Sequence, residues 1–318
     1  MWLQAFKRME NFVLIAVCIA AGMALKASRL LPTDAHKGIN AWVLYVALPA
    51  VSFKYLPHTQ WTSQMLFPVL SPAIVLLGSI AYMRLFGHYK KHSEYEMSTL
   101  KLASGFSNTS FVGFPLVVAY FGEQYLNVAV ICDQAMFALL SSAGVLIAIN
   151  GNPGNGGGHA TPGMIIKRLI TFPPFVGCVA ALTLGNLIDL NFAAPVFSKL
   201  AATIAPLALF SVGLQLDFKG WQKEVPDLSV TLLYKLLLAP ALVLGVAIAL
   251  GIQKEIAWIC IFEAAMPTVI TSTIIAEQFG LNYRYINMAI GISIVVGFAT
   301  TALWYLVLTL PAIAGWLG

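Results

Sequence analysis

The sequence predicts an all-α polytopic membrane protein with ten transmembrane helices in two inverted five-helix repeats, in which broken helices four and nine cross. Three observations predict this fold class. Hydrophobic residues make up 59% of the 318 residues and charged residues only 10%, a balance that soluble domains of this length do not show. Ten apolar stretches are each near the ~20 residues that cross a bilayer as a helix. Two of them carry polar residues and a proline near their middle, in corresponding places of the two halves.

The candidate spans follow one another along nearly the whole chain. The first apolar run comes after Lys7 and Arg8 and resembles a signal peptide, but the many similar runs that follow indicate a retained helix. The spans cover residues 11–30, 38–55, 65–86, 97–122, 126–149, 167–187, 195–216, 228–251, 256–279 and 286–310.

Lysine and arginine set the expected orientation, because cytoplasmic loops carry an excess of both. Of the 18 such residues, 12 fall at one side of the spans, five at the other, and Lys235 lies inside a span. Both termini are therefore expected outside the cell. Residues 150–163, NGNPGNGGGHATPG, are then cytoplasmic, and their glycine-rich composition is typical of a flexible linker.

The linker separates residues 1–149 from residues 164–318, and each part holds five spans. The two parts align weakly: Phe121 and Phe279, each followed by glycine, are 279 − 121 = 158 positions apart. Because a repeat with an odd number of spans inserts its second copy upside down, the two broken spans are expected to cross near the bilayer midplane.

The first broken span contains residues 105–122, GFSNTSFVGFPLVVAYFG, and the second contains residues 263–280, EAAMPTVITSTIIAEQFG. In hydrocarbon, non-helical backbone survives only where it is packed in protein or lines a cavity. Proline lacks an N–H group, so Pro115 suits the first turn of a new half-helix, and the first break is expected at residues 108–115. Pro267 marks the second break.

Two half-helix N-termini that face each other leave free N–H groups and partial positive charge, which favour a carboxylate or another anion. Small polar side chains around the breaks would add neutral hydrogen bonds, or would instead only satisfy the broken backbone; Ser107 and Ser272 belong to this group. The candidate substrate-binding residues are Asn108, Thr109, Ser110, Gly113, Pro115, Pro267, Thr268 and Thr271.

Ionisable residues inside spans are costly and are therefore functional candidates. Glu263 lies one turn before Pro267, and Asp133 lies in the fifth span beside Gln134. A buried carboxyl favours its protonated form, so Glu263 and Asp133 are candidates for coupling to H⁺ or Na⁺, with a structural pairing as the alternative. Lys235 is expected near the inner end of its span, where its side chain would snorkel to the interface, with a functional role as the alternative.

Other chemistry finds little support in the sequence. All five histidines lie in predicted loops, and no nucleophile–base set, HExxH motif or P-loop occurs. The four cysteines are isolated in sequence and imply neither a disulfide framework nor a metal site. No basic run is long enough for nucleic acid. We therefore expect neither an enzyme nor a bound cofactor.

Several motifs resemble those of one family. Residues 108–115, NTSFVGFP, are similar to the Asn-Thr-Gly-Phe-x-Gly-x-Pro signature of the auxin efflux carrier family. LPAVSF, YFGEQYL, LALFSVGLQL and AAMPTVITSTIIAEQFG also resemble that family, so the resemblance covers nearly the whole chain. Ser110 stands where the family usually has glycine, and the plant-type Asn-Pro-x-x-Tyr motif is absent.

The resemblance implies a secondary transporter whose fold resembles bile-acid/sodium symporters and sodium/proton antiporters. Spans one, two, six and seven would form a scaffold, and spans three to five and eight to ten a transport domain that moves as an elevator. Plant members export auxin, whereas bacterial members are associated with malonate, malate and related acids. The short linker resembles that of bacterial members, which implies a bacterial inner-membrane protein, and plant members imply a homodimer.

Three hypotheses follow. The first is a transporter of small organic anions. The second is a cation/proton antiporter that uses Glu263 and Asp133 and needs no organic substrate. The third is a channel or a substrate sensor that binds ligand without counterflow.

Overall fold

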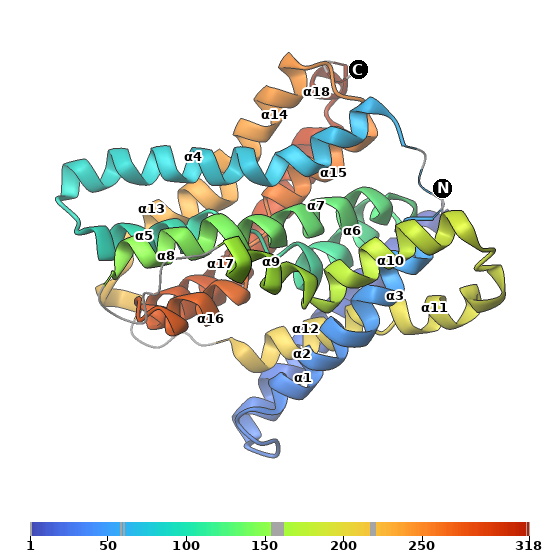
Figure 1. Ribbon diagram of the computed structural model, residues 1–318, viewed down its shortest axis with the longest axis horizontal. Helices are drawn as coiled ribbons and strands as arrows, with labels where there is room; N and C mark the ends of the chain where they lie inside the picture. The colour runs from blue at the N-terminus through green and yellow to red at the C-terminus, as the bar shows by residue number, and fades with distance from the viewer. Residues whose placement is uncertain are drawn as a thin grey trace. The chain divides into compact units, whose positions relative to one another are not determined.

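The computed structural model describes residues 2–57, 59, 61–153, 162–216, 221–315 and 317, and these residues form helices and connecting segments without any β-strand (Figure 1). The predicted all-helical class is therefore confirmed for this part of the chain. Residues 154–161 of the predicted linker lie outside the described residues, so the linker's character stays a prediction.

Six helices in the described part of the chain are long and apolar enough to cross a membrane, and a bent pair makes a seventh candidate. This supports a polytopic membrane protein, while the full count of ten spans and the inverted repeat stay predictions. The six helices are Met9–Ser28, Ser63–Lys90, Glu123–Gly151, Ala194–Gln215, Val225–Ala249 and Tyr283–Thr309.

The expected sixth span, residues 167–187, is not one straight helix. The segments Gly163–Ile170 and Pro173–Gly185 meet at an angle of 70°. Prolines 173 and 174 follow the bend, and proline cannot donate the backbone hydrogen bond that would continue the preceding helix. The expected span therefore contains a bend near its N-terminal end that hydropathy did not predict.

Prolines also explain most of the irregular turns within long helices. Of the four π-helical turns in the described residues, Val43–Ala47, Thr109–Gly113 and Tyr234–Leu238 end two residues before a proline. A wider turn accommodates the missing N–H group and the bulk of the ring. The fourth, Leu140–Gly144, has no proline nearby.

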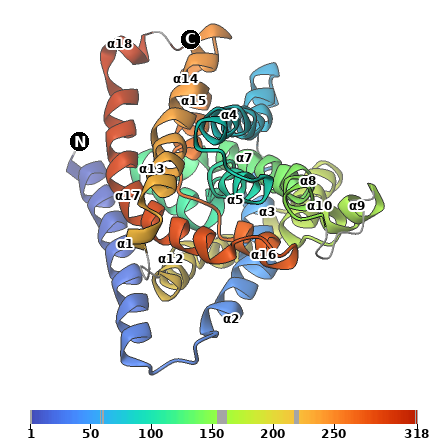
Figure 2. The same cartoon turned by 90° about the vertical axis from the view of Figure 1, so that its left-hand side faces the viewer.

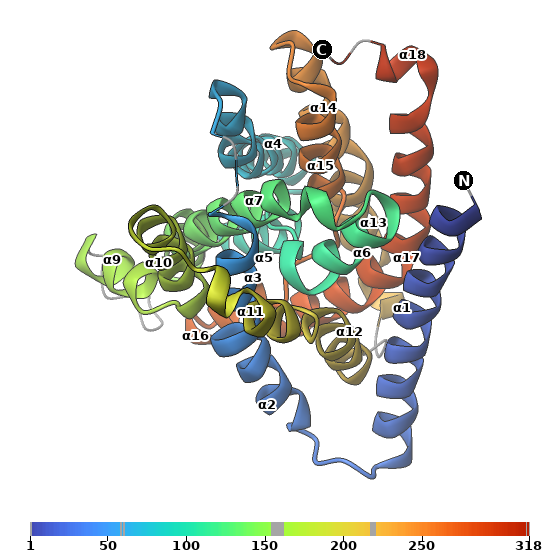
Figure 3. The same ribbon diagram turned by 90° about the vertical axis from the view of Figure 1, so that its right-hand side faces the viewer.

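The chain folds into two compact units. Unit 1 contains Met1–Trp61, Ser110–Val130 and Arg168–Leu216. In this unit α1 packs along α12, and α3 packs on α10 and α11 (Figure 3). A Cβ atom on Gly22 of α1 would meet backbone atoms of Phe210 and Gly213 in α12, so small residues permit this close helix pair. The helices of unit 1 are α1 (Trp2–Ser28), α2 (Ala35–Trp42), α3 (Leu48–Tyr55), α6 (Phe114–Tyr120), α10 (Pro173–Leu187), α11 (Ala194–Ala201) and α12 (Ile204–Gln215).

Unit 2 contains Thr62–Thr109, Ile131–Lys167 and Asp217–Gly318. Here α4 packs on α5, α14 and α15, and α5 also contacts α8 and the long α17 (Figure 2). Two helices, α7 (Leu126–Leu139) and α9 (Pro162–Ile170), have residues in both units. The others are α4 (Leu66–Lys90), α5 (Glu94–Ser104), α8 (Val145–Gly151), α13 (Val225–Leu233), α14 (Ala239–Ala249), α15 (Lys254–Ala264), α16 (Thr271–Gln278), α17 (Tyr283–Thr309) and α18 (Pro311–Ala314).

Candidate functional site: two paired helix breaks

The two interrupted stretches are broken in the structure, and their breaks lie side by side in unit 2. The chain is non-helical at residues 105–108, between α5 and the helical turn that starts at Thr109, and again at residues 265–270, between α15 and α16. The Asn108 N–H donates to the Pro267 carbonyl at 2.8 Å, and the Val269 N–H donates to the Phe106 carbonyl at 3.2 Å. Each break therefore supplies backbone partners to the other, which is how a buried break avoids unpaired polar groups.

The first break begins earlier than expected. Helical winding resumes at Thr109 as a π-helical turn, and α6 then starts at Phe114 with Pro115 in its first turn. The predicted place of Pro115 is confirmed, but the break ends at residue 108 and does not extend to residue 115, because the wide turn accommodates the proline.

Lys235 lies at the centre of the paired breaks. Its side chain is fully buried, and its Nζ donates to the Ser107 hydroxyl at 2.7 Å and to the Ala264 carbonyl at 2.8 Å. The snorkelling expected from the sequence is therefore wrong. The π-helical turn that holds Lys235 lies within α13–α14 in unit 2, and the ammonium has polar partners inside the protein.

Asp133 belongs to the same buried region. The Thr109 hydroxyl donates to its Oδ1 at 2.5 Å, and the Gln134 side-chain amide lies 3.4 Å from its Oδ2. The carboxyl group is only 4% exposed. A hydrogen-bonded carboxyl at this depth can hold a charge or a proton, and Thr109 ties it to the first break.

Glu263 lies in the last turn of α15 and is 2% exposed. Neither carboxyl oxygen has a hydrogen-bond partner among the described residues. It faces a cavity of about 10 Å³, close to the space that one water needs. The cavity is also lined by the side chains of Ser71, Ser107, Thr109 and Cys132. A buried carboxyl without a partner is costly, which makes Glu263 a place where a proton or cation would bind favourably.

The hydroxyl groups of the second break contact backbone instead. The Thr268 hydroxyl donates to the Ala103 carbonyl at 2.7 Å, and the Ser272 hydroxyl donates to the Leu102 carbonyl at 3.1 Å. The Thr268 N–H donates to the Ser293 hydroxyl at 3.1 Å. The two hydroxyl contacts satisfy carbonyl groups in the last turn of α5. This is the structural role that the sequence analysis gave as the alternative to substrate binding.

The structure thus brings most predicted site residues together in unit 2. Thr271 begins α16, while Ser110, Gly113 and Pro115 belong to unit 1. The predicted residues gathered around the paired breaks are Asn108, Thr109, Asp133, Gln134, Glu263, Pro267 and Thr268.

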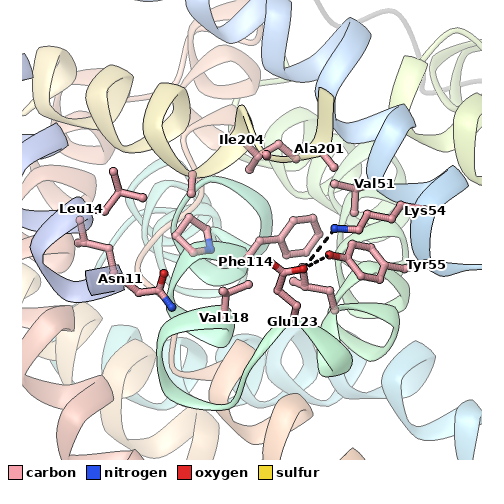
Figure 4. Close-up of a pocket in the computed structure, with 15 residues that line it drawn as sticks. Asn11, Leu14, Val51, Lys54, Tyr55, Phe114, Val118, Glu123, Ala201 and Ile204 are labelled. Carbon is pink, nitrogen blue, oxygen red and sulfur yellow. Dashed lines mark hydrogen bonds and ion pairs between the residues drawn. The ribbon is translucent and has the colours of Figure 1, made fainter. Parts of the chain in front are cut away.

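Unit 1 has a cavity of about 190 Å³ (Figure 4). At one end Glu123 accepts hydrogen bonds from the Lys54 ammonium and the Tyr55 hydroxyl, both at 3.2 Å. The lining is otherwise mostly apolar and includes Phe114 and Pro115, the first residues of α6. Such a cavity suits a small molecule with an apolar body and a polar end.

Comparison with known proteins gives this geometry its context. Residues 9–155 and 159–305 match the membrane transport protein family, which is that of the auxin efflux carriers. The chain belongs to this family. It is 25% identical to an uncharacterized transporter of Methanothermobacter thermautotrophicus over 94% of this chain and 98% of that protein. It is also 25% identical to a Rhizobium meliloti protein named "Putative malonate transporter", over 87% of this chain and 88% of that protein.

The auxin efflux carrier signature, residues 108–115, runs from the first break to the first turn of α6. Its asparagine is the residue whose N–H pairs with the second break, and its proline begins the second half-helix. The signature thus contains the last residue of the first break and the helical turns that follow it.

Sequence reasoning missed several residues around the paired breaks in unit 2 and in the cavity of unit 1. Cys132 and Cys260 are free thiols whose sulfur atoms lie 3.8 Å apart, although they are isolated in sequence. Ser71 and Ser293 were also missed, because single serines in apolar spans are common and only tertiary packing brings these two to the site. Lys54 was counted only as a loop charge, and Glu123 was visible only within the family motif YFGEQYL.

Proposed function

We propose that this protein is a secondary active transporter of small organic anions, namely carboxylates such as malonate and malate or auxin-like weak acids. The observation that carries the proposal is the pair of helix breaks hydrogen-bonded to each other through Asn108 and Pro267. Two interrupted helices in corresponding halves of a polytopic protein are characteristic of transporter binding sites. Membership of the auxin efflux carrier family and the name of the Rhizobium meliloti relative support the same substrate class.

Charge at the breaks favours an anion. The Lys235 ammonium adds a positive charge at the first break, and the helix that starts at Thr109 directs its N-terminal N–H groups toward that end. We propose that a substrate carboxylate binds beside Asn108 and Thr109. Pro267, Thr268 and Thr271 would shape the rest of this site in unit 2, and Ser110, Gly113 and Pro115 of unit 1 stay predicted substrate-binding residues.

We further propose that ten spans form two inverted repeats and that transport follows an elevator mechanism. Support comes from the division into units: unit 1 holds α1–α3 and α10–α12, the helices of predicted spans one, two, six and seven. Residues Ser110–Val130 also belong to unit 1, so a hinge would lie close to the first break. We propose that the protein is a homodimer in the inner membrane of a bacterium. Both termini would lie outside the cell and the linker in the cytoplasm.

A second candidate function is a cation/proton antiporter. The unpartnered oxygens of Glu263 and the nearby buried Asp133 are its specific support. In this alternative the carboxyl groups bind the transported ions directly, and the coupling ion is H⁺ or Na⁺.

Counterflow in proteoliposomes distinguishes the organic-anion transporter from the cation/proton antiporter. Liposomes preloaded with unlabelled malonate, malate, succinate, pyruvate or indole-3-acetate are tested for uptake of the labelled acid. We expect exchange of at least one acid, a loss of at least tenfold in Asn108→Ala, and no loss in the control Asn287→Ala, which changes an exposed asparagine. Cation-dependent proton release without exchange of any acid would establish the antiporter instead.

A further inference from the structure

The surroundings of the Lys235 ammonium resemble those of a bound alkali-metal ion. Its two partners are a hydroxyl oxygen, on Ser107, and a backbone carbonyl oxygen, on Ala264 in the last turn of α15. Hard monovalent cations take oxygen ligands of these kinds. In transporters with broken helices, the coupling cation is typically bound by unwound backbone carbonyls and by the C-terminal ends of half-helices.

A second observation points to a cation at the same place. Ser107, which accepts the lysine hydrogen bond, also lines the small cavity that the Glu263 carboxyl faces. That carboxyl is 2% exposed and has no hydrogen-bond partner among the described residues, so its nearest compensation is electrostatic. The ammonium of Lys235, which donates a hydrogen bond to Ser107, interacts electrostatically with Glu263 and supplies such compensation.

We propose that Lys235 is a built-in cation that occupies the coupling-ion position between the two breaks, so that no free metal ion is needed there. The proposal rests on the proposed transport function, because it concerns the ion that accompanies the substrate. In this arrangement the Ser107 hydroxyl and the Ala264 carbonyl bind the ammonium. The ammonium in turn supplies a permanent positive charge beside the two breaks and Glu263.

A count of charges shows what the lysine changes. The ionisable groups that act on Glu263 are Lys235, Asp133 and the Cys132 thiol. With Lys235 present, one positive charge offsets one of the two carboxylates. Without it, the Glu263 carboxyl loses this positive charge, and it must bind a proton or a cation from solution. The vacated oxygen ligands and the cavity beside them would then accept Na⁺.

A variant that removes the charge of Lys235 but keeps most of its side-chain volume tests the proposal. Lys235→Met and wild type are reconstituted, and [¹⁴C]malonate counterflow is measured in NaCl and in choline chloride. Thermal unfolding in detergent is measured in the same two salts. Lys199→Met, a change on the exposed face of α11, is the matched control.

We expect wild type and Lys199→Met to exchange malonate equally, within about twofold, in both salts, with the same Tm. In choline chloride, Lys235→Met should exchange malonate at least tenfold more slowly than wild type. In NaCl, the same variant should exchange at least fivefold faster than it does in choline chloride. NaCl should also raise the Tm of this variant by at least about 2 °C, because an ion that binds only the folded state stabilises it.

Three outcomes would overturn the proposal: a wild type that needs Na⁺, a Lys235→Met that exchanges normally in choline, or a folded Lys235→Met that is inactive in both salts. If wild-type protein exchanges no acid at all, the transport proposal fails, whereas the salt dependence of Tm still tests the lysine. If Lys235→Met does not fold, the double variant Lys235→Met/Glu263→Gln should fold, because it removes the unpaired carboxylate as well. A double variant no more stable than the single one would refute the charge pairing.

Discussion

The two helix breaks are similar in backbone and different in chemistry. Each is a short non-helical segment that pairs with the other through one backbone hydrogen bond in each direction. At the first break and in the turn that follows it, the hydroxyl groups of Ser107 and Thr109 contact charged groups, Lys235 and Asp133. At the second break and in the turn that follows it, the hydroxyl groups of Thr268 and Ser272 contact backbone carbonyls of α5.

This difference separates two roles that a polar residue in an apolar span can have. A hydroxyl that contacts a backbone carbonyl completes the hydrogen bonds at the end of a helix. A hydroxyl that contacts a buried ammonium or carboxyl group positions a charge and influences what else can bind there. The first break is therefore expected to control transport, and the second to hold the first in place.

The largest expected effect is on exchange in Thr109→Val. This change keeps the shape of the side chain but leaves Asp133 Oδ1 without the hydroxyl donor, at a cost of about 1–3 kcal/mol. We expect counterflow of the exchanged acid to fall about tenfold or more. Ser272→Ala in the second break should retain exchange within about twofold. Equal losses in both variants would contradict the division of roles.

Thermal stability should depend more on the hydrogen bonds of the second break than on those of the first. Thr268→Val leaves the buried Ala103 carbonyl without its side-chain donor, and we expect it to lower the free energy of unfolding by about 1–3 kcal/mol. Unfolding followed in detergent gives this value, with the exposed Thr309→Val as a control expected to change it by less than about 0.5 kcal/mol. A neutral Thr268→Val would show that its hydrogen bond is not needed to hold the second break.

Composition and proline positions were enough to predict the helical membrane class and the two breaks. These features are local: apolar runs of span length must be helical in lipid, and proline with small polar residues interrupts them. Pro115 begins α6 as expected for the same reason. The bend before Pro173 was missed because hydropathy averages over about 19 residues and does not register a local change of direction.

The charges at the site were harder to predict, because they depend on contacts between distant parts of the chain. Lys235 and Ser107 are 128 positions apart, and nothing near Lys235 in sequence indicates a buried partner. A lysine close to the end of an apolar span more commonly snorkels. Only the tertiary structure shows that its π-helical turn lies against the paired breaks.

The glycines that end the two broken spans offer a finer comparison. Gly122 has φ 106° and ψ 163°, a region used almost only by glycine, whereas Gly280 has φ 68°, close to the left-handed helical region. We expect Gly122→Ala to cost about 1–3 kcal/mol and Gly280→Ala about 1 kcal/mol. Asparagine tolerates the left-handed region, so Gly280→Asn should be milder still. Equal costs at both glycines, measured by thermal unfolding, would argue against this distinction.

The smallest effect concerns α5 and α15, the helices that precede the two breaks, because their N-termini are capped differently. A capping box starts α5: the Glu96 carboxylate accepts from the Ser93 N–H at 2.8 Å and from its hydroxyl at 2.9 Å. The first residue before α15, Gln253, makes no side-chain cap. The Ser93 N–H and hydroxyl groups lower the pKa of Glu96, so its ionised form is favoured in the folded protein.

A folded-state pKa below the unfolded value means that this stabilisation is complete above the unfolded pKa of about 4.3 and is lost as the pH falls through the folded pKa. Glu96→Ala should therefore lower the Tm slightly at pH 7, and the difference from wild type should shrink steadily below about pH 4. Gln253→Ala at the start of α15 should show no such pH dependence, because this change removes no carboxylate and no side-chain cap. A Glu96→Ala difference that stays constant from pH 7 to pH 3 would show that the capping carboxylate does not contribute through its charge.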